Sequence, residues 1–273
     1  MTTMTKMFPV SACFLIGCVV SVPPDEGSTW TYEDEPQICV ATDGTNGGDA
    51  GTIDLRFGPG WPEHSTIQVS AGAGGVGGVG ASGAGAPGDP GAPGAVLMTE
   101  DPDATCDLDD LDPDWAFEVD VDGDQTHFTW YTRSGDLSLI EADRFVIGTG
   151  VDLVFHGDLT VRAREFVIEP GASLTVRAGD GIGLSAPGLA IGDVPEWWDA
   201  DGGSLVVDAE RVVLEGDIDV SGLDAIDLPT MSDGGSGGSI LMTTKEFVWI
   251  DGAMRANGGQ GEDGVDEREC ERD

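Results

Sequence analysis

Alternating apolar and polar residues run through the middle of the chain and predict β-strands. Leu159 and Val161 alternate with polar or small residues, and Leu174 and Val176 do the same. A period of two with many β-branched residues is typical of strands that bury one face. Because no stretch shows a convincing helical stripe, the pattern predicts an all-β fold.

A six-residue segment recurs four times in this region. Its copies begin at Ala142, Ala163, Ala209 and Thr244, and the fourth residues of the copies are Phe145, Phe166, Val212 and Phe247. The step from Phe145 to Phe166 is 21 residues. The longer steps to Val212 and Phe247 fit one such unit with insertions, and the step to Val212 also fits two irregular units. The segments therefore predict a structural repeat of about 21 residues.

Each copy lies between two short alternating runs, so one unit contains three predicted strands. Such a unit cannot bury its inner face alone, but stacked copies can form a continuous core. We therefore expect a parallel β-helix, or β-solenoid, with three-strand rungs and Gly-rich loop insertions. The N-terminal half follows the same pattern, since residues 94–99 match 238–243 and residues 66–72 match 217–222. Over roughly residues 51–259 the chain resembles the glycine-rich solenoid-repeat surface proteins of bacteria.

The domain boundaries follow from composition. Residues 51–259 form the predicted solenoid, which includes a Gly- and Ala-rich insertion at 71–94 and an acidic segment at 100–124. Three collagen-like triplets in the insertion are too few for a triple helix, so we expect a loop there. Residues 260–273 are predicted to be an acidic disordered tail.

The N-terminus has the features of an export signal. Residues 1–17 contain one basic residue, Lys6, and a short apolar stretch, which is typical of a secretory signal peptide. The run Leu15-Ile16-Gly17-Cys18 resembles the lipobox of bacterial lipoproteins. The resemblance implies that Cys18 carries acyl chains, which anchor the protein in a lipid bilayer. Residues 18–50 would then be the lipidated N-terminus and tether. An ordinary cleaved signal is the alternative, so the chain is expected at the bacterial cell surface or outer membrane, or secreted.

Charge excludes one class of partner. The chain has 51 acidic and 12 basic side chains, a formal net charge of −39. A nucleic-acid partner is excluded because phosphate binding depends on clustered Lys and Arg. So acidic a surface is suited to high salt, which screens self-repulsion, or to a calcium-rich extracellular setting.

The cysteines allow one disulfide after export. Signal cleavage removes Cys13, lipidation modifies Cys18, and Cys39, Cys106 and Cys270 remain. An odd number leaves one thiol unpaired. We prefer a Cys39–Cys106 pair because Cys270 lies in the acidic tail.

Two groups of residues suggest ligands. The spacing of the first ligands of a calcium loop is found in Asp120, Asp122 and Asp124. Such a loop needs a bidentate Glu at its twelfth position, where this chain has Tyr131. A β-hairpin at Asp122-Gly123 is therefore favoured over a calcium site. The adjacent Trp197 and Trp198 could stack on sugar rings or pack against their own loop.

Another candidate, His156, follows the inward Phe155, and we expect a surface histidine close to Arg177; an acid/base role is the alternative.

These features favour a non-catalytic cell-surface lipoprotein with a structural or adhesive role. The alternatives are a carbohydrate-active enzyme resembling polysaccharide lyases, and a carbohydrate-binding module that uses Trp197 and Trp198. No motif for a catalytic elbow, a zinc protease or a phosphate loop is present. The expected partners are a lipid bilayer through Cys18 and a polysaccharide or other surface component. No cofactor is expected, and calcium is the alternative.

Overall fold

A computed structural model describes most of the chain after residue 40. The described residues are 41–59, 66–80, 83–101, 108–122, 125–131, 137–179, 182–192, 200–225, 233–249 and 251–264. All of them belong to one compact unit, Ile38–Asp273. Strands dominate this unit, which confirms the all-β prediction, and no described helix is long and apolar enough to cross a membrane.

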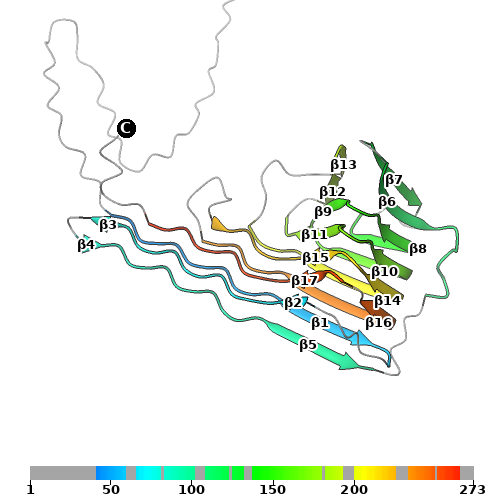
Figure 1. Cartoon of the computed structure of the whole chain (residues 1–273), viewed down its shortest axis with the longest axis horizontal. Helices are drawn as coiled ribbons and strands as arrows, with labels where there is room; N and C mark the ends of the chain where they lie inside the picture. Colours follow the sequence, from blue (N-terminus) through cyan, green and yellow to red (C-terminus); the bar gives the residue numbers. More distant parts are fainter. Residues whose placement is uncertain are drawn as a thin grey trace, which may run out of the picture. The chain divides into compact units, whose positions relative to one another are not determined.

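The longer strands form an eight-stranded sheet in the order β5-β1-β16-β14-β10-β8-β6-β7 (Figure 1). These strands are β1 (Thr52–Phe57), β5 (Ala95–Glu100), β6 (Ala116–Asp122), β7 (Gln125–Tyr131), β8 (Leu139–Ile147), β10 (Leu159–Ile168), β14 (Ser204–Leu214) and β16 (Ser239–Trp249). All neighbours in this sheet are parallel except β6 and β7, which form an antiparallel hairpin. The hairpin predicted at Asp122-Gly123 is thereby confirmed.

The shorter strands form a seven-stranded sheet in the order β13-β12-β9-β11-β15-β17-β2. They are β2 (Thr66–Gln68), β9 (Asp152–His156), β11 (Ser173–Arg177), β12 (Gly183–Ala186), β13 (Leu189–Gly192), β15 (Asp217–Asp219) and β17 (Ala253–Arg255). Here β12 pairs antiparallel with both β9 and β13. A separate two-stranded hairpin joins β3 (Val79–Gly80) to β4 (Gly83–Ala84).

The predicted parallel β-helix with three-strand rungs is wrong. Apart from the β3–β4 hairpin, the strands form two sheets, and each of these two contains antiparallel as well as parallel pairs. The first predicted strand and the repeated segment are one continuous strand, as in β10. Neighbours also depart from chain order, because β1 lies between β16 and β5. Hydrophobic alternation reports which face of a strand is buried, but it does not report where a strand ends or which strand lies beside it.

The alignment of the repeated segments does match the register of the sheet. Phe166 is the partner of Phe145 on one side and of Val212 on the other, and Val212 is the partner of Phe247. The rings of Phe117, Phe145 and Phe166 stack with centroids 4.7 and 4.9 Å apart, which is the spacing of neighbouring strands. These rings are fully buried in one core that both sheets line. In-register stacking of identical side chains therefore fixes the alignment of β6, β8 and β10.

The Gly-rich segments form an ordered layer. Residues 71–78 and 85–94 lie outside the strands, as the predicted loop does, but their backbones are hydrogen-bonded to neighbouring segments. Figure 1 shows these segments as extended chains lying side by side between the strands and the β3–β4 hairpin. Gly44 and Gly47 donate to the carbonyl oxygens of Ala86 and Asp89, both at 2.9 Å. Each successive partner is three residues further along, which is the period of a polyproline II helix. We call the stacked segments 42–51, 70–78, 85–94, 233–238 and 256–264 the glycine layer.

Two predicted segment boundaries change with this layer. The predicted tether includes residues 41–50, and the predicted disordered tail includes residues 260–264. Instead Gly48 donates to Gly259 at 2.8 Å and Gly261 donates to Ala73 at 2.8 Å. Composition alone suggested disorder because the hydrogen-bonding partners are distant in the sequence.

Glycine is required where these segments touch. A Cβ atom on Gly48 would lie 1.9 Å from the carbonyl oxygen of Gly235, and one on Gly88 would lie 1.8 Å from that of Thr45. Backbone therefore packs directly on backbone, as in the crowded axis of a collagen helix.

Polar side chains complete the layer at the same three-residue interval. The side-chain oxygens of Asp43, Asn46 and Asp49 accept backbone N–H groups of the neighbouring segment at 2.7, 2.9 and 2.6 Å. On the 256–264 segment, the side-chain oxygens of Asn257, Gln260 and Asp263 accept N–H groups in the same way. Part of the acidic composition therefore serves as backbone hydrogen-bond acceptors.

We expect Gly48→Ala to lower the free energy of unfolding by about 1–3 kcal/mol, because the added methyl group has no space between two backbones. Urea unfolding followed by circular dichroism measures the change. Ala86→Ser, at an exposed position of the same layer, is the control and should leave stability nearly unchanged. Equal stability of the two variants would contradict close packing at Gly48.

Candidate functional site

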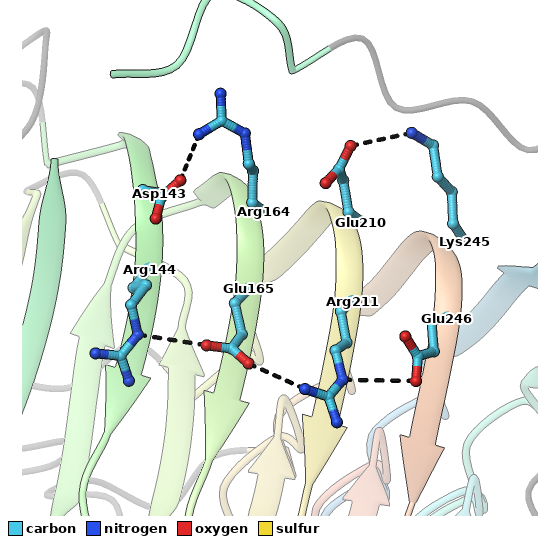
Figure 2. Close-up of a pocket in the computed structure, with 8 residues that line it drawn as sticks. All are labelled: Asp143, Arg144, Arg164, Glu165, Glu210, Arg211, Lys245 and Glu246. Atoms are coloured by element: carbon cyan, nitrogen blue, oxygen red, sulfur yellow. Dashed lines mark hydrogen bonds and ion pairs between the residues drawn. The ribbon is translucent and has the colours of Figure 1, made fainter. Parts of the chain in front are cut away.

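Eight charged side chains line an open groove of about 500 Å³ on the eight-stranded sheet (Figure 2). They come in consecutive pairs from four parallel strands. The pairs are Asp143 and Arg144 on β8, Arg164 and Glu165 on β10, Glu210 and Arg211 on β14, and Lys245 and Glu246 on β16. We call this set the charged groove.

The local sequence explains why both members of each pair face solvent. On β8 the inward Ala142 and Phe145 are fully buried, and two charged residues stand between them. If side chains alternated strictly along β8, one of the two charged side chains would point into the core, where an unpaired charge is costly. Figure 2 shows the ribbons bending between the two rows of charged side chains, and this bend directs both rows outward.

The first row is a continuous chain of ion pairs across all four strands. Glu165 accepts from Arg144 at 3.3 Å and from Arg211 at 3.3 Å, and Arg211 lies 3.6 Å from Glu246. Glu118 of β6 extends the row, with its Oε1 3.0 Å from Arg144 Nη1. The charge of the first-row side chain therefore changes sign from one strand to the next.

The second row carries the opposite signs at each strand. Arg164 pairs with Asp143 at 2.5 Å, and Lys245 pairs with Glu210 at 3.1 Å. Four bases and four acids cancel, so the charged groove is neutral in a chain of net charge −39. Each charge consequently has an oppositely charged neighbour on the next strand.

This arrangement can select strand neighbours. The side chains are about one quarter to two thirds exposed, so each pair contributes under about 1 kcal/mol. Like charges placed directly opposite each other would repel. Strands β8 and β14 carry acid then base, whereas β10 and β16 carry base then acid, so exchanging two neighbouring strands would bring like charges together.

An alignment of the repeated segments by their apolar residues alone does not reveal this site. The signal was present in the two residues before each Phe or Val: Asp-Arg, Arg-Glu, Glu-Arg and Lys-Glu. A reversal of sign from one copy to the next is the pattern expected when copies lie side by side in register.

Arg162, beside the charged groove, and Arg164, within it, hold the acidic segment that follows β5. Arg162 pairs with the buried Glu141 at 2.5 Å and lies 3.6 Å from Asp110. Arg164 also donates to the carbonyl oxygen of Leu111 at 2.9 Å. Leu108 and Leu111 pack with Trp115 in a small apolar cluster of their own. Part of the acidic segment 100–124 is thus attached to the sheet.

The predicted calcium residues are only partly described. Asp120 is exposed on β6, and its Oδ1 accepts the N–H of Val121 at 2.8 Å. Asp122 pairs through its backbone with Gln125, and Asp124 lies outside the described residues. Within the described ranges no group of three or more His, Cys, Asp or Glu side chains is arranged to hold a metal ion.

The other predicted site residues cannot be placed. Cys18, Cys39, Cys106, Trp197 and Trp198 all lie outside the described residues. Lipidation of Cys18, the Cys39–Cys106 disulfide and sugar binding by the tryptophans therefore stay predictions.

His156 is buried, and the prediction of a surface histidine is wrong. Only 1% of the residue is exposed, because β12 pairs with β9 and places Gly183 opposite it. The predicted neighbour is correct, since Arg177 is its partner in β11. Burial lowers the pKa of His156 below its ordinary value, and the positive charge of Arg177 lowers this pKa further.

We expect Glu165→Gln to destabilise the fold by about 1 kcal/mol at low salt, because two arginines lose their shared carboxylate. Urea unfolding at low salt and in about 1 M NaCl should show that the loss shrinks with salt. Glu215→Gln is the matched control, since it removes the same charge and Glu215 lies outside the charged groove. A salt-independent loss at Glu165 would argue against the ion-pair interpretation.

Stability should also decrease in mild acid through His156. Below about pH 6.5 the unfolded chain binds a proton on this imidazole more readily than the folded chain. The free energy of unfolding should therefore fall as pH drops from about 6.5 towards the lower folded pKa, by at most about 1.4 kcal/mol per pH unit. His156→Leu should remove this slope, whereas the exposed His127→Gln should retain it. An unchanged slope in His156→Leu would assign the effect to other groups.

Comparison with known proteins does not add to these observations. No protein-family model matches the chain, and neither the curated proteins nor the solved structures gave a significant match.

Proposed function

We propose that this chain is an exported, lipid-anchored surface protein with a structural or adhesive role, and not an enzyme. The run Leu15-Ile16-Gly17-Cys18 after a short apolar stretch supports the anchor. Several acyl chains on one cysteine are enough for stable membrane attachment. A net charge of −39 supports a protein that works in salty or calcium-rich surroundings outside the cell.

The glycine layer is the observation that carries the proposal. Its central segment, 42–51, is hydrogen-bonded on several sides. Thr45, Gly48 and Gly51 donate to the 256–262 segment at 2.9, 2.8 and 2.8 Å. Carbonyl oxygens of the same central segment accept N–H groups from residues 72–78. Chains that would be flexible as loops are held in one conformation, so a partner that binds them loses little conformational entropy.

The outer segment of the layer presents a regular surface. In residues 85–93 the glycines at every third position are half-buried, and the two residues between them are exposed. The exposed residues are Ala86, Pro87, Asp89, Pro90, Ala92 and Pro93. Proline fixes φ near the polyproline II value, so the ridge is already in the conformation that aromatic-lined grooves bind. An ordered, exposed ridge of this kind suits adhesion or assembly.

Anchoring is tested by expressing the full chain in a lipoprotein-processing bacterium with labelled fatty acid. We expect label on the wild-type chain and recovery in the membrane fraction, with both lost in Cys18→Ser. Cys13→Ser, which changes a cysteine of the predicted signal peptide, should behave as wild type. Labelling of Cys18→Ser at the wild-type level would contradict the anchor.

The absence of catalysis is tested on the same detergent-solubilised full-length chain. The chain is incubated with a panel of acidic and neutral polysaccharides, with calcium and with chelator. We expect no release of reducing ends from any of these polysaccharides, whether or not the chain is retained on them. Release above the level of a heat-denatured sample would overturn the proposal in favour of a carbohydrate-active enzyme.

A further inference from the structure

The two ends of the eight-stranded sheet differ. At one end the antiparallel strand β7 covers the core with Phe128 and Trp130, which pack against it. At the other end β5 is the outermost strand, and all six of its residues are exposed (Figure 1). Val96, Leu97 and Met98 are 41%, 57% and 36% exposed. Three consecutive large apolar residues thus lie on a strand edge that no other described strand covers, and such an edge is a template for another strand.

Within the part of the chain that the structure describes, β5 has a neighbouring strand on one side only. Ala95 and Asp101 donate to Gly51 and Phe57, so the odd-numbered residues face β1. In a parallel ladder the residues between them direct both N–H and C=O to the other side. Val96 and Met98 therefore present their backbone groups outward, away from β1.

The side chains of β5 continue the rows of the core. Val96 is in register with Ile53, and Met98 is in register with Leu55, and both partners are buried. Leu97 lies on the opposite face of the sheet, in register with Asp54. The seven-stranded sheet ends at β2, and β5 has no counterpart among the described strands of that sheet. The rows of core side chains that run across the sheet therefore end at Val96 and Met98, which are exposed to solvent.

We propose that β5 pairs antiparallel with β5 of a second copy of this chain, with Leu97 at the two-fold axis. The outward N–H and C=O groups of Val96 would then form hydrogen bonds with those of Met98 in the second copy. By symmetry, Met98 of the first copy would pair in the same way with Val96 of the second. Val96 and Met98 would lie opposite each other on the core face, and the two Leu97 side chains would meet on the other face. One register thus covers all three exposed apolar residues and is self-complementary, as a two-fold interface requires.

Charge favours this register. Ala95 to Thr99 carry no charge in a chain of net charge −39. In the antiparallel pairing Glu100 lies opposite Gly94, and Asp101 lies opposite Pro93, so no like charges face each other. A parallel in-register pair would instead place Glu100 beside Glu100, which is unfavourable. The remaining repulsion between the two acidic molecules is long-range and is screened by salt.

The register is tested with one introduced cysteine at a time in the full chain in which all five native cysteines are replaced by serine, so that neither acyl chains nor native thiols cause association. The two Leu97 residues form a non-hydrogen-bonded pair with Cα atoms about 4.5 Å apart, within disulfide range. Leu97→Cys should therefore give a disulfide-linked dimer under mild oxidation, identified by mass spectrometry of the joined peptides. Thr99→Cys is the matched control on the same face, because its two copies would lie about 13 Å apart. Equal cross-linking at the two positions, or none at Leu97, would overturn the register.

Association itself is measured by analytical ultracentrifugation at about 0.15 M and about 1 M NaCl. We expect a dimer that strengthens with salt, and a dissociation constant at least about tenfold higher in Leu97→Lys. Ile182→Lys is the control, since Ile182 is an apolar residue of similar exposure, 42%, away from β5. A wild-type chain that stays monomeric in high salt would overturn the proposal and leave the edge to a different protein. This inference does not depend on the proposed function, because it is tested without anchoring or polysaccharide.

Discussion

Direct packing of backbone on backbone is the constraint on which much of this structure depends. In the glycine layer a carbonyl oxygen occupies the place where a Cβ atom would otherwise be, as between Gly48 and Gly235. The close approach allows a hydrogen bond at every third residue, and the side-chain oxygens of residues such as Asn46 accept further N–H groups. Glycine is thus selected by space between segments rather than by turn geometry. The layer is stabilised by many backbone hydrogen bonds that replace the apolar contacts of an ordinary core.

Some strands of the eight-stranded sheet continue directly from segments of the glycine layer. Segment 42–51 leads into β1, and segment 85–94 leads into β5. Thr52 pairs with both Ser239 and Ala95, so the register set by the apolar core continues into the glycine layer. Rows of stacked side chains in the sheets and rows of backbone hydrogen bonds in the layer therefore support one alignment of the strands.

The acidic composition has several roles in this arrangement. Carboxylates such as Asp43 accept backbone N–H groups in the layer, and others such as Glu165 join arginines across strands. The charged groove gathers four of the twelve basic residues of the chain, and each is paired there with an acid. Positive charge is thus concentrated where it can order neighbouring strands, and the remaining acids keep the surface strongly negative.

The sequence by itself determined that these segments are strands, which of their faces are buried, and the register of the repeated segments, because alternation and the recurrence of Phe145 and Phe166 are local properties. It also determined the β6–β7 hairpin through Asp122-Gly123. Only the tertiary structure decided that β1 lies between β16 and β5, and that the Gly-rich runs are ordered. The partners of those runs are far away in the chain: the hydrogen bond between Asn46 and Asp233 spans 187 residues. A pattern of apolar residues encodes which face is buried, whereas the choice of neighbour depends on backbone spacing and charge, which appear only when the segments come together.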